Sequence, residues 1–417
     1  MNATTPITIG YTPKYLAWTG SHASPQRARL AVEHILARTE DQHIETRVIE
    51  PELDRERAFE ELSLVHSEDF IRRVFKGDEP GAPGKLQGTT ATYMFLGTSV
   101  LVEQIEADGM KPQVYFNPQG AKHHAAYAHS SGFCVFNDMA WAAQYFAAKG
   151  LRVAYLDWDA HHGDGVEALT AKNSSILTAS IHQRGIFPGT GMRTSAKNRA
   201  FNYPLEAGAG DDGLLEAVED AIYAIRDFEP HIILLACGAD GLKGDPLSSL
   251  GYSIEEGIIP ASEMVGDLAH ELGVPVLIGG SGGYQPFTYV PIAWAETVLT
   301  IHDALTRERG HKGTAMVLAD DPEWERYGNA WDEDDALQDD RQDDRGARKQ
   351  AIMDDLADRH PLTWEGLLTR EEFDIVQEEI TPIILAAMEA EVGAKPSTRG
   401  ERNNRRRAAK GKQGAKR

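Results

Sequence analysis

The chain has 417 residues, of which 41% are hydrophobic, and a formal net charge of −22. This apolar content is enough for a large core and excludes a wholly disordered protein. No run of about 18 uncharged apolar residues occurs, and the first residues lack a basic region followed by an apolar segment. We therefore expect no membrane span, no signal peptide and a cytoplasmic location. Cys134 and Cys237 lie among apolar neighbours without the spacing of a zinc site, which predicts buried free thiols.

From Ile7 to about residue 315, short apolar runs alternate with helix-like segments. Strands are predicted at residues 112–116, 152–158, 175–182, 231–237 and 274–279. Helices are predicted at residues 137–150 and 211–228. Strands that are apolar on both faces and separated by helices favour an α/β fold, with three αβα layers around a mostly parallel sheet. In such folds the ligand site lies at the carboxyl ends of the strands.

The remaining quarter of the chain differs in composition. We predict a main domain at residues 1–315, an acidic linker or loop at 316–350, an accessory helical segment at 351–394 and a basic disordered tail at 395–417. The tail carries ten Lys and Arg residues against one Glu, a charge of +9, so the rest of the chain is near −31. A nonspecific, solubilising tail is favoured over contact with nucleic acid.

Polar clusters follow four of the predicted strands, and one of them, DWDAHHGDG, has the residues of a metal site. Asp159 and His161 are two positions apart, so at an extended strand end they point the same way and can bind one ion. Asp240 follows another buried strand, where an unpaired carboxylate would be costly. Two carboxylates and one imidazole suit zinc, and also ferrous iron or cobalt. The alternative is a hydrogen-bonded Asp159–His161 pair without metal.

In combination, these clusters resemble the arginase-like histone deacetylase family, and within it the class I-like bacterial acetoin-utilisation deacetylases. The resemblance extends from about Ile7 to Trp294. It rests on eight motifs in the family's order: HASPQR, HSEDFIRRV, AKHHA, SGFCVFND, YLDWDAHHGDGV, SIHQRGIFPGTG, CGADGLKGDPL and GGSGGY. It implies the arginase/deacetylase fold.

The resemblance also implies roles for particular residues. Its metal ligands are Asp159, His161 and Asp240. The imidazole of His124 removes a proton from water and later protonates the leaving amine, while His123 acts electrostatically. Asp157 and Asp164 orient the two histidines, Asp157 with His123 and Asp164 with His124. The hydroxyl of Tyr284 stabilises the oxyanion of the tetrahedral state.

Further positions carry the family's substrate channel and second cation site. Gly132 and Phe133 with Phe187 form the channel walls, Leu247 lies at its mouth, and Asp78 holds the substrate backbone. The implied potassium site comprises Asp157, Asp159, His161, Ser180 and Ile181. Arg27 matches an arginine behind the active site that holds departing acetate, or else forms an ordinary ion pair. Ala121 and Ser281 depart from the family's glycines, and both are small enough to preserve the geometry.

We therefore expect a zinc-dependent enzyme, with potassium as a second cation, that hydrolyses the ε-N-acetyl group of lysine in proteins. The resemblance suggests acetylated metabolic enzymes such as acetyl-CoA synthetase as substrates, in acetoin or acetate metabolism. The alternatives are an acetylpolyamine amidohydrolase on the same fold and a catalytically silent acetyl-lysine-binding scaffold. Arginase activity is disfavoured, because a two-manganese site needs more ligands than these loops offer.

Overall fold

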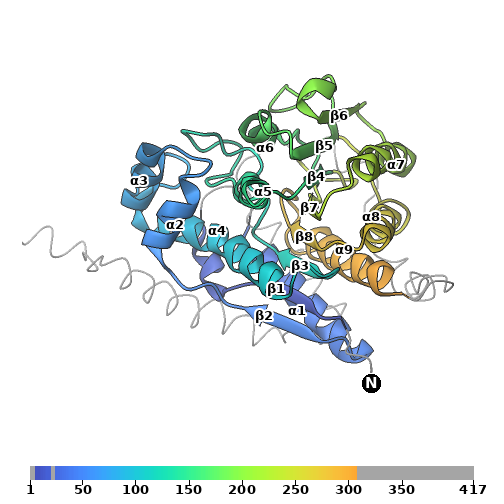
Figure 1. The fold of residues 1–417 in the computed structure, drawn as a ribbon, viewed down its shortest axis with the longest axis horizontal. Helices are drawn as coiled ribbons and strands as arrows, with labels where there is room; N and C mark the ends of the chain where they lie inside the picture. The colour runs from blue at the N-terminus through green and yellow to red at the C-terminus, as the bar shows by residue number, and fades with distance from the viewer. Residues whose placement is uncertain (1–4, 20–23, 308–417) are drawn as a thin grey trace, which may run out of the picture.

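A computed structural model of the chain describes residues 5–19 and 24–307 (Figure 1). The expected acidic linker, accessory helical segment and basic tail lie outside these residues, as does the end of the expected main domain. Within the described residues, one eight-stranded sheet runs through the molecule with helices on both faces. None of the described helices is long and apolar enough to cross a lipid bilayer.

The sheet has the strand order β2-β1-β3-β8-β7-β4-β5-β6, and every pair of neighbours is parallel. The strands are β1 (Ile7–Gly10), β2 (Thr46–Ile49), β3 (Val114–Asn117), β4 (Val153–Asp157), β5 (Ile176–Gln183), β6 (Ala200–Leu205), β7 (Ile232–Ala236) and β8 (Val276–Gly279). All carboxyl ends therefore meet at one edge of the sheet, as the apolar runs predicted.

The helices alternate with the strands along the chain. They are α1 (Gln26–Gln42), α2 (Arg55–Leu62), α3 (Glu68–Lys76), α4 (Gly84–Ala107), α5 (Asp138–Ala148), α6 (Asp164–Thr170), α7 (Asp211–Phe228), α8 (Ile259–Leu272) and α9 (Tyr289–Thr306). Shorter helical turns are η1 (Pro13–Ala17), η2 (Ala196–Asn198) and η3 (Ile254–Ile258). The predicted helices at residues 137–150 and 211–228 are α5 and α7.

Two separate apolar cores bury the two faces of the sheet. On one face, residues of α1, α7, α8 and α9 pack against the strands, with Val114 and Phe116 of β3 pointing toward them. On the other face, α2, α3, α4 and α5 pack together, and Tyr115 of β3 points that way. Successive side chains of a strand thus enter opposite cores, which is why the strands are apolar throughout. The structure is a three-layer αβα fold, as expected.

The sequence pattern locates five adjacent interior strands and misses β1 and the two edge strands. The five predicted runs correspond to β3, β4, β5, β7 and β8, which lie next to one another in the sheet. The edge strands β2 and β6 have partly exposed residues, and β6 contains Pro204. An edge strand has a paired neighbour on one side only and is partly exposed, so it lacks the continuous apolar run that marks a long interior strand. The interior strand β1 is buried, but it has only four residues and includes Thr8 and Gly10, so its apolar run is short.

Candidate active site

The five central strands, β3, β8, β7, β4 and β5, each deliver polar residues to the same edge of the sheet. The loop after β3 carries His123 and His124, and the loop after β8 carries Tyr284. Asp240 follows β7. Asp157 ends β4, with Asp159 and His161 just beyond it, and β5 contains Ser180. Residues far apart in the chain converge because neighbouring parallel strands end side by side.

Asp159, His161 and Asp240 form a buried cluster that can hold a metal ion. One ligand atom from each residue lies within 4.8 Å of the others. His161 Nδ1 is 2.8 Å from Asp240 Oδ2 and 3.2 Å from Asp159 Oδ1. Two carboxylates therefore face one imidazole nitrogen, and a cation bound by all three could replace these hydrogen bonds. A set of three protein ligands with two carboxylates and one imidazole fits a catalytic divalent metal, which takes water or substrate as its fourth ligand.

Backbone and hydroxyl donors fix the orientation of the two carboxylates. Asp159 Oδ2 accepts hydrogen bonds from the Gly282 N–H at 2.6 Å and from the Ser281 hydroxyl at 2.8 Å. Asp240 Oδ1 accepts from the Ala160 N–H at 2.8 Å. A side chain at Gly282 would collide with both carboxylates, so only glycine allows this close approach. Such bonds hold ligands in position before a metal arrives.

The electrostatics of the metal-free cluster show how strongly it attracts positive charge. Burial opposes protonation of His161, yet hydrogen bonds and charges from Asp159 and Asp240 raise its pKa to about 11. Burial, together with the neighbouring Asp159 charge, raises the pKa of Asp240 to about 6. For Asp159, burial is outweighed by His123 and His161, and its pKa falls well below its usual range. The two carboxylates therefore favour a positive charge at the His161 position.

The tandem histidines each form a hydrogen-bonded pair with a carboxylate. His123 Nδ1 is 2.7 Å from Asp157 Oδ2, and His124 Nδ1 is 2.7 Å from Asp164 Oδ1. A carboxylate only accepts, so Nδ1 carries the proton in both rings. The Nε2 atom of His124 is therefore left to exchange a proton when that ring is neutral. Both expected histidine–aspartate pairs are thus present, with the expected partners.

The two histidines differ in charge. For His124, burial and the neighbouring charge of His123 lower the pKa to about 4, so the ring is neutral at pH 7. For His123, burial is outweighed by Asp157 and Asp159, which raise the pKa to about 9. The ring centroids are only 3.9 Å apart, which makes a doubly charged pair unfavourable. A neutral His124 can accept a proton, and a positive His123 can stabilise negative charge.

Tyr284 is held at the site by its backbone and by its ring. Its N–H donates to Asp245 Oδ2 at 2.8 Å, and its ring lies edge-on to Phe133 with centroids 6.0 Å apart. Arg27 of α1 is 2% exposed; it donates to the carbonyl of Gly283 and stacks over Trp294. Arg27 therefore supports the loop that carries Tyr284, and among the described residues it forms no ion pair. Its expected contact with acetate stays a prediction.

The proposed channel residues surround the tandem histidines and the tyrosine. Phe187 packs edge-on against His124, with centroids 5.0 Å apart, and Phe133 packs against Tyr284. Both phenylalanines are about half exposed, at 50% and 42%. Gly132 has a φ of +51° and lies so close to His124 that a Cβ would overlap that ring. Aromatic walls next to the catalytic groups suit an aliphatic stem.

Other predicted positions lie farther from these groups. Leu247 is 37% exposed and its N–H binds Asp245, the same carboxylate that holds Tyr284. Asp78 is exposed on the turn after α3, where its backbone N–H caps the helix. The structure gives Asp78 no contact with the site residues, so its role in holding substrate remains a prediction.

The residues predicted for potassium lie beneath the metal cluster. Asp157 of β4 is opposite Ser180 of β5 in the sheet register, and Ile181 follows. Asp157 already accepts hydrogen bonds from the Tyr155 hydroxyl and the Asp159 N–H. The Ser180 hydroxyl lies 3.0 Å from His182 Nδ1. These residues are close together, and a potassium ion among them remains a prediction.

The two departures from the family's glycines have a physical consequence. Ala121 and Ser281 both adopt positive φ angles, 56° and 61°, which are unfavourable for residues with a Cβ. Hydrogen bonds compensate at both positions, because the Ala121 N–H donates to Asp138 Oδ2 and the Ser281 hydroxyl binds Asp159. That these small residues preserve the family's loop geometry stays a prediction.

Sequence reasoning missed residues that hold the histidine loop. Buried Asp138 accepts from the N–H groups of Ala121 and Lys122, and His66 links Ala126 to Asn137 at 2.9 Å on each side. Both lie inside quoted motifs, HSEDFIRRV and SGFCVFND, which was the available signal. By contrast, His162 of DAHHGD contacts Thr190 and Glu167 instead of the metal ligands.

Comparison with known proteins agrees with this geometry. Residues 21–301 match the family model described as the histone deacetylase domain. The chain is 36% identical over 315 residues to the acetoin utilization protein AcuC of Bacillus subtilis, covering 68% of this chain and 79% of that one. It is 31% identical over 262 residues to histone deacetylase 8 of Xenopus laevis, covering 58% and 78%. It is 35% identical over 250 residues to AcuC of Staphylococcus aureus strain MSSA476, covering 57% and 63%.

Proposed function

Because this chain belongs to the histone deacetylase domain family, we propose that it is a zinc-dependent hydrolase of ε-N-acetyl-lysine in proteins. The observation that carries the proposal is the convergence of a buried Asp159–His161–Asp240 cluster with two histidine–aspartate pairs. The cluster supplies the ligands, and the pairs supply one neutral and one charged imidazole. Amide hydrolysis requires an electrophile and a proton carrier within one site.

The donor set supports zinc as the metal. Zinc favours three protein ligands with an open position in catalytic sites, and mixed oxygen and nitrogen ligands also accept ferrous iron. When bound by Asp159, His161 and Asp240, the metal would polarise the amide carbonyl and acidify a water molecule. Potassium near Asp157 and Ser180 would balance the carboxylates beneath this site.

The proton transfers belong to the histidines. Neutral His124 takes a proton from the attacking water at Nε2 and afterwards donates it to the departing lysine amine. Asp164 keeps Nδ1 protonated, so Nε2 is the nitrogen that accepts the proton. Charged His123 favours the oxyanion that forms as water adds to the carbonyl. The C–N bond then breaks, giving free lysine and acetate.

Tyr284 and the aromatic walls supply orientation. In this proposal the Tyr284 hydroxyl donates a hydrogen bond to the oxyanion, an interaction that is stronger in the tetrahedral state than in the amide. Phe133 and Phe187 can enclose the methylenes of a lysine side chain. This arrangement favours acetyl-lysine in an exposed segment of a protein.

We further propose acetylated metabolic enzymes, such as acetyl-CoA synthetase, as physiological substrates, and a role in acetoin or acetate use. The similarity to two AcuC proteins supports this proposal. The test combines purified, zinc-loaded protein with acetyl-lysine peptides, acetylated spermidine and acetylated acetyl-CoA synthetase. Acetate release from the peptide and the enzyme, but not from spermidine, is the expected result. Normal zinc binding without acetate release from any acetyl-lysine substrate would refute the assignment.

A further inference from the structure

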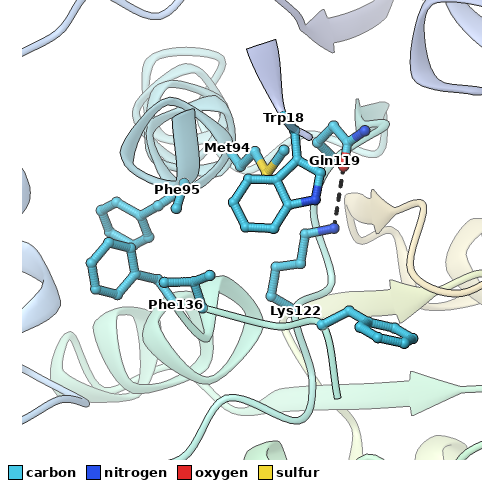
Figure 2. Close-up of a pocket in the computed structure, with 9 residues that line it drawn as sticks. Trp18, Met94, Phe95, Gln119, Lys122 and Phe136 are labelled. Carbon is cyan, nitrogen blue, oxygen red and sulfur yellow. Dashed lines mark hydrogen bonds between the residues drawn. The ribbon is translucent and has the colours of Figure 1, made fainter. Parts of the chain in front are cut away.

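The loop that carries the tandem histidines is backed by closely packed side chains. Trp18, Phe136 and Gln119 line the space around Lys122, which directly precedes His123 (Figure 2). The Lys122 ammonium donates to Gln119 Oε1 at 3.3 Å. The free space left between these side chains is about that of one water molecule. Packing from behind therefore helps to fix the histidine loop.

The loop that carries Tyr284 has a different kind of support. Residues 280–288 form neither helix nor strand, and Gly283 has a φ of +124°. Arg27 holds the carbonyl of Gly283, and Asp245 accepts the N–H of Tyr284 itself. Within residues 5–19 and 24–307 this is the one hydrogen bond of Tyr284, because its hydroxyl bonds to none of them. The place of Tyr284 therefore depends strongly on Asp245.

Asp245 is 7% exposed, and each of its carboxylate oxygens accepts a backbone hydrogen bond. Oδ1 accepts from the Leu247 N–H at 2.9 Å, and Oδ2 accepts from the Tyr284 N–H at 2.8 Å. The first bond closes a local turn over Pro246, whose ring restricts the backbone. This turn orients the carboxylate and leaves its second oxygen for Tyr284. One side chain thus joins the proposed channel mouth to the proposed oxyanion donor.

The loop that contains Asp245 is in turn tied to a residue of the metal cluster. The Ser248 hydroxyl donates to the backbone carbonyl of Asp240, and the Asp245 N–H donates to the carbonyl of Leu242 at 3.1 Å. These bonds close residues 240–248 into a compact loop. Asp245 therefore has a defined position relative to Asp240.

We propose that Asp245 is a positioning residue that sets the Tyr284 hydroxyl against the oxyanion, an inference that rests on the proposed hydrolase function. A donor stabilises an oxyanion only when it lies about 2.7–3.1 Å from the place that the oxyanion occupies. A small displacement of the Tyr284 backbone would therefore remove most of the effect of its hydroxyl. Asp245 acts through Tyr284 and takes no part in the proton transfers.

A double-mutant cycle separates this role from a merely structural one, because a residue that acts through the Tyr284 hydroxyl has no effect once that hydroxyl is absent. Asp245→Asn leaves one acceptor oxygen and sets an amide N–H against the second backbone N–H. With the zinc-loaded full chain and an acetyl-lysine peptide, this variant should lower kcat about tenfold and keep KM within about threefold of wild type. Its zinc affinity should not change. In the Tyr284→Phe background, Asp245→Asn should change kcat by less than about twofold.

Two further variants keep the test independent of folding. Asp211→Asn is the matched control, because the half-buried Asp211 carboxylate also accepts two hydrogen bonds, from the N–H and the hydroxyl of Ser253 at 2.7 and 2.9 Å. It should lower the free energy of unfolding in urea and leave kcat unchanged in both backgrounds. Pro246→Gly, at an exposed position, keeps the Asp245 carboxylate and loosens its turn. It should lower kcat about threefold, and only when the Tyr284 hydroxyl is present.

A spectroscopic arm gives a readout besides turnover. Fluorotyrosine is incorporated at position 284, and its fluorine NMR resonance is compared between variants of the zinc-loaded full chain. Asp245→Asn should shift or broaden this resonance, whereas Asp211→Asn should leave it unchanged. An equal loss of kcat in both Tyr284 backgrounds, a wild-type kcat in Asp245→Asn, or an unchanged resonance in that variant would overturn the positioning role. If wild type hydrolyses no acetyl-lysine peptide while the resonance responds to Asp245→Asn, the proposed function fails and the hold of Asp245 on Tyr284 stands.

Discussion

Gly132 offers a sharp test of how closely the proposed substrate channel holds His124, the proposed base. An alanine Cβ at this position would overlap His124 Cδ2, and it would lie 2.7 Å from His124 Cγ and 2.9 Å from Phe187 Cε1. Ordinary carbon contacts begin near 3.5 Å, so the His124 ring would have to move by roughly 1 Å. A misplacement of that size costs about 100-fold in rate. The positive φ of Gly132 adds a conformational cost of about 1–2 kcal/mol for alanine.

Gly150 provides the matched control for this substitution. It has a φ of +82° at the end of α5, and a Cβ there would meet nothing within 4 Å. Gly150→Ala should therefore lose about 1–2 kcal/mol of unfolding free energy and keep full activity. Gly132→Ala should lose a similar or greater amount of stability and about 100-fold in kcat/KM. Urea unfolding and acetyl-lysine peptide hydrolysis measure both quantities. If Gly132→Ala kept wild-type kcat/KM, the described packing of Gly132 against His124 would be wrong.

Three further predictions address the ligands and their partners. Ser281→Ala removes the hydroxyl bound to Asp159 Oδ2 and should weaken zinc binding about tenfold in a chelator competition. Unchanged zinc affinity would show that the Ser281 hydroxyl does not hold Asp159 in position for the metal. In Asp164→Asn, the amide that replaces the carboxylate no longer fixes the proton on His124 Nδ1. This variant should lower kcat about 10-fold or more while its zinc affinity stays constant. A kcat equal to that of wild type would exclude His124 as the base. Against the effect of burial, Asp159 and Asp240 raise the pKa of His161 to about 11, so zinc binding must displace a proton from this ring. Zinc loading at about pH 8 should therefore release about one proton per chain in a pH-stat titration, and the apparent affinity for zinc should rise with pH below about 11. Absence of proton release would contradict the described cluster.

Much of the fold follows from local sequence patterns. Interior strands such as β4 and β7 are buried on both faces, so a continuous apolar run identifies them without knowledge of their neighbours. The edge strands β2 and β6 pair with a neighbouring strand on one side only, and their mixed polar and apolar sequences resemble those of loops. The free, buried state of Cys134 and Cys237 was likewise predictable, because apolar neighbours indicated it directly.

Part of the candidate site could also be predicted from local sequence, and part of it could not. Asp159 and His161 could be paired from sequence because side chains two apart at a strand end point in the same direction. The partners of His162 are Thr190 and Glu167, which no spacing rule connects to it.

The most direct test of the account is the position of zinc in crystals of the metal-loaded full chain, located by anomalous diffraction and compared with Asp240→Asn. We predict one strong zinc peak at about 2.0–2.2 Å from Asp159, His161 and Asp240, with the peak lost or greatly reduced in the variant. A zinc peak elsewhere, or equal occupancy in Asp240→Asn, would contradict the proposed metal site and the hydrolytic function built on it.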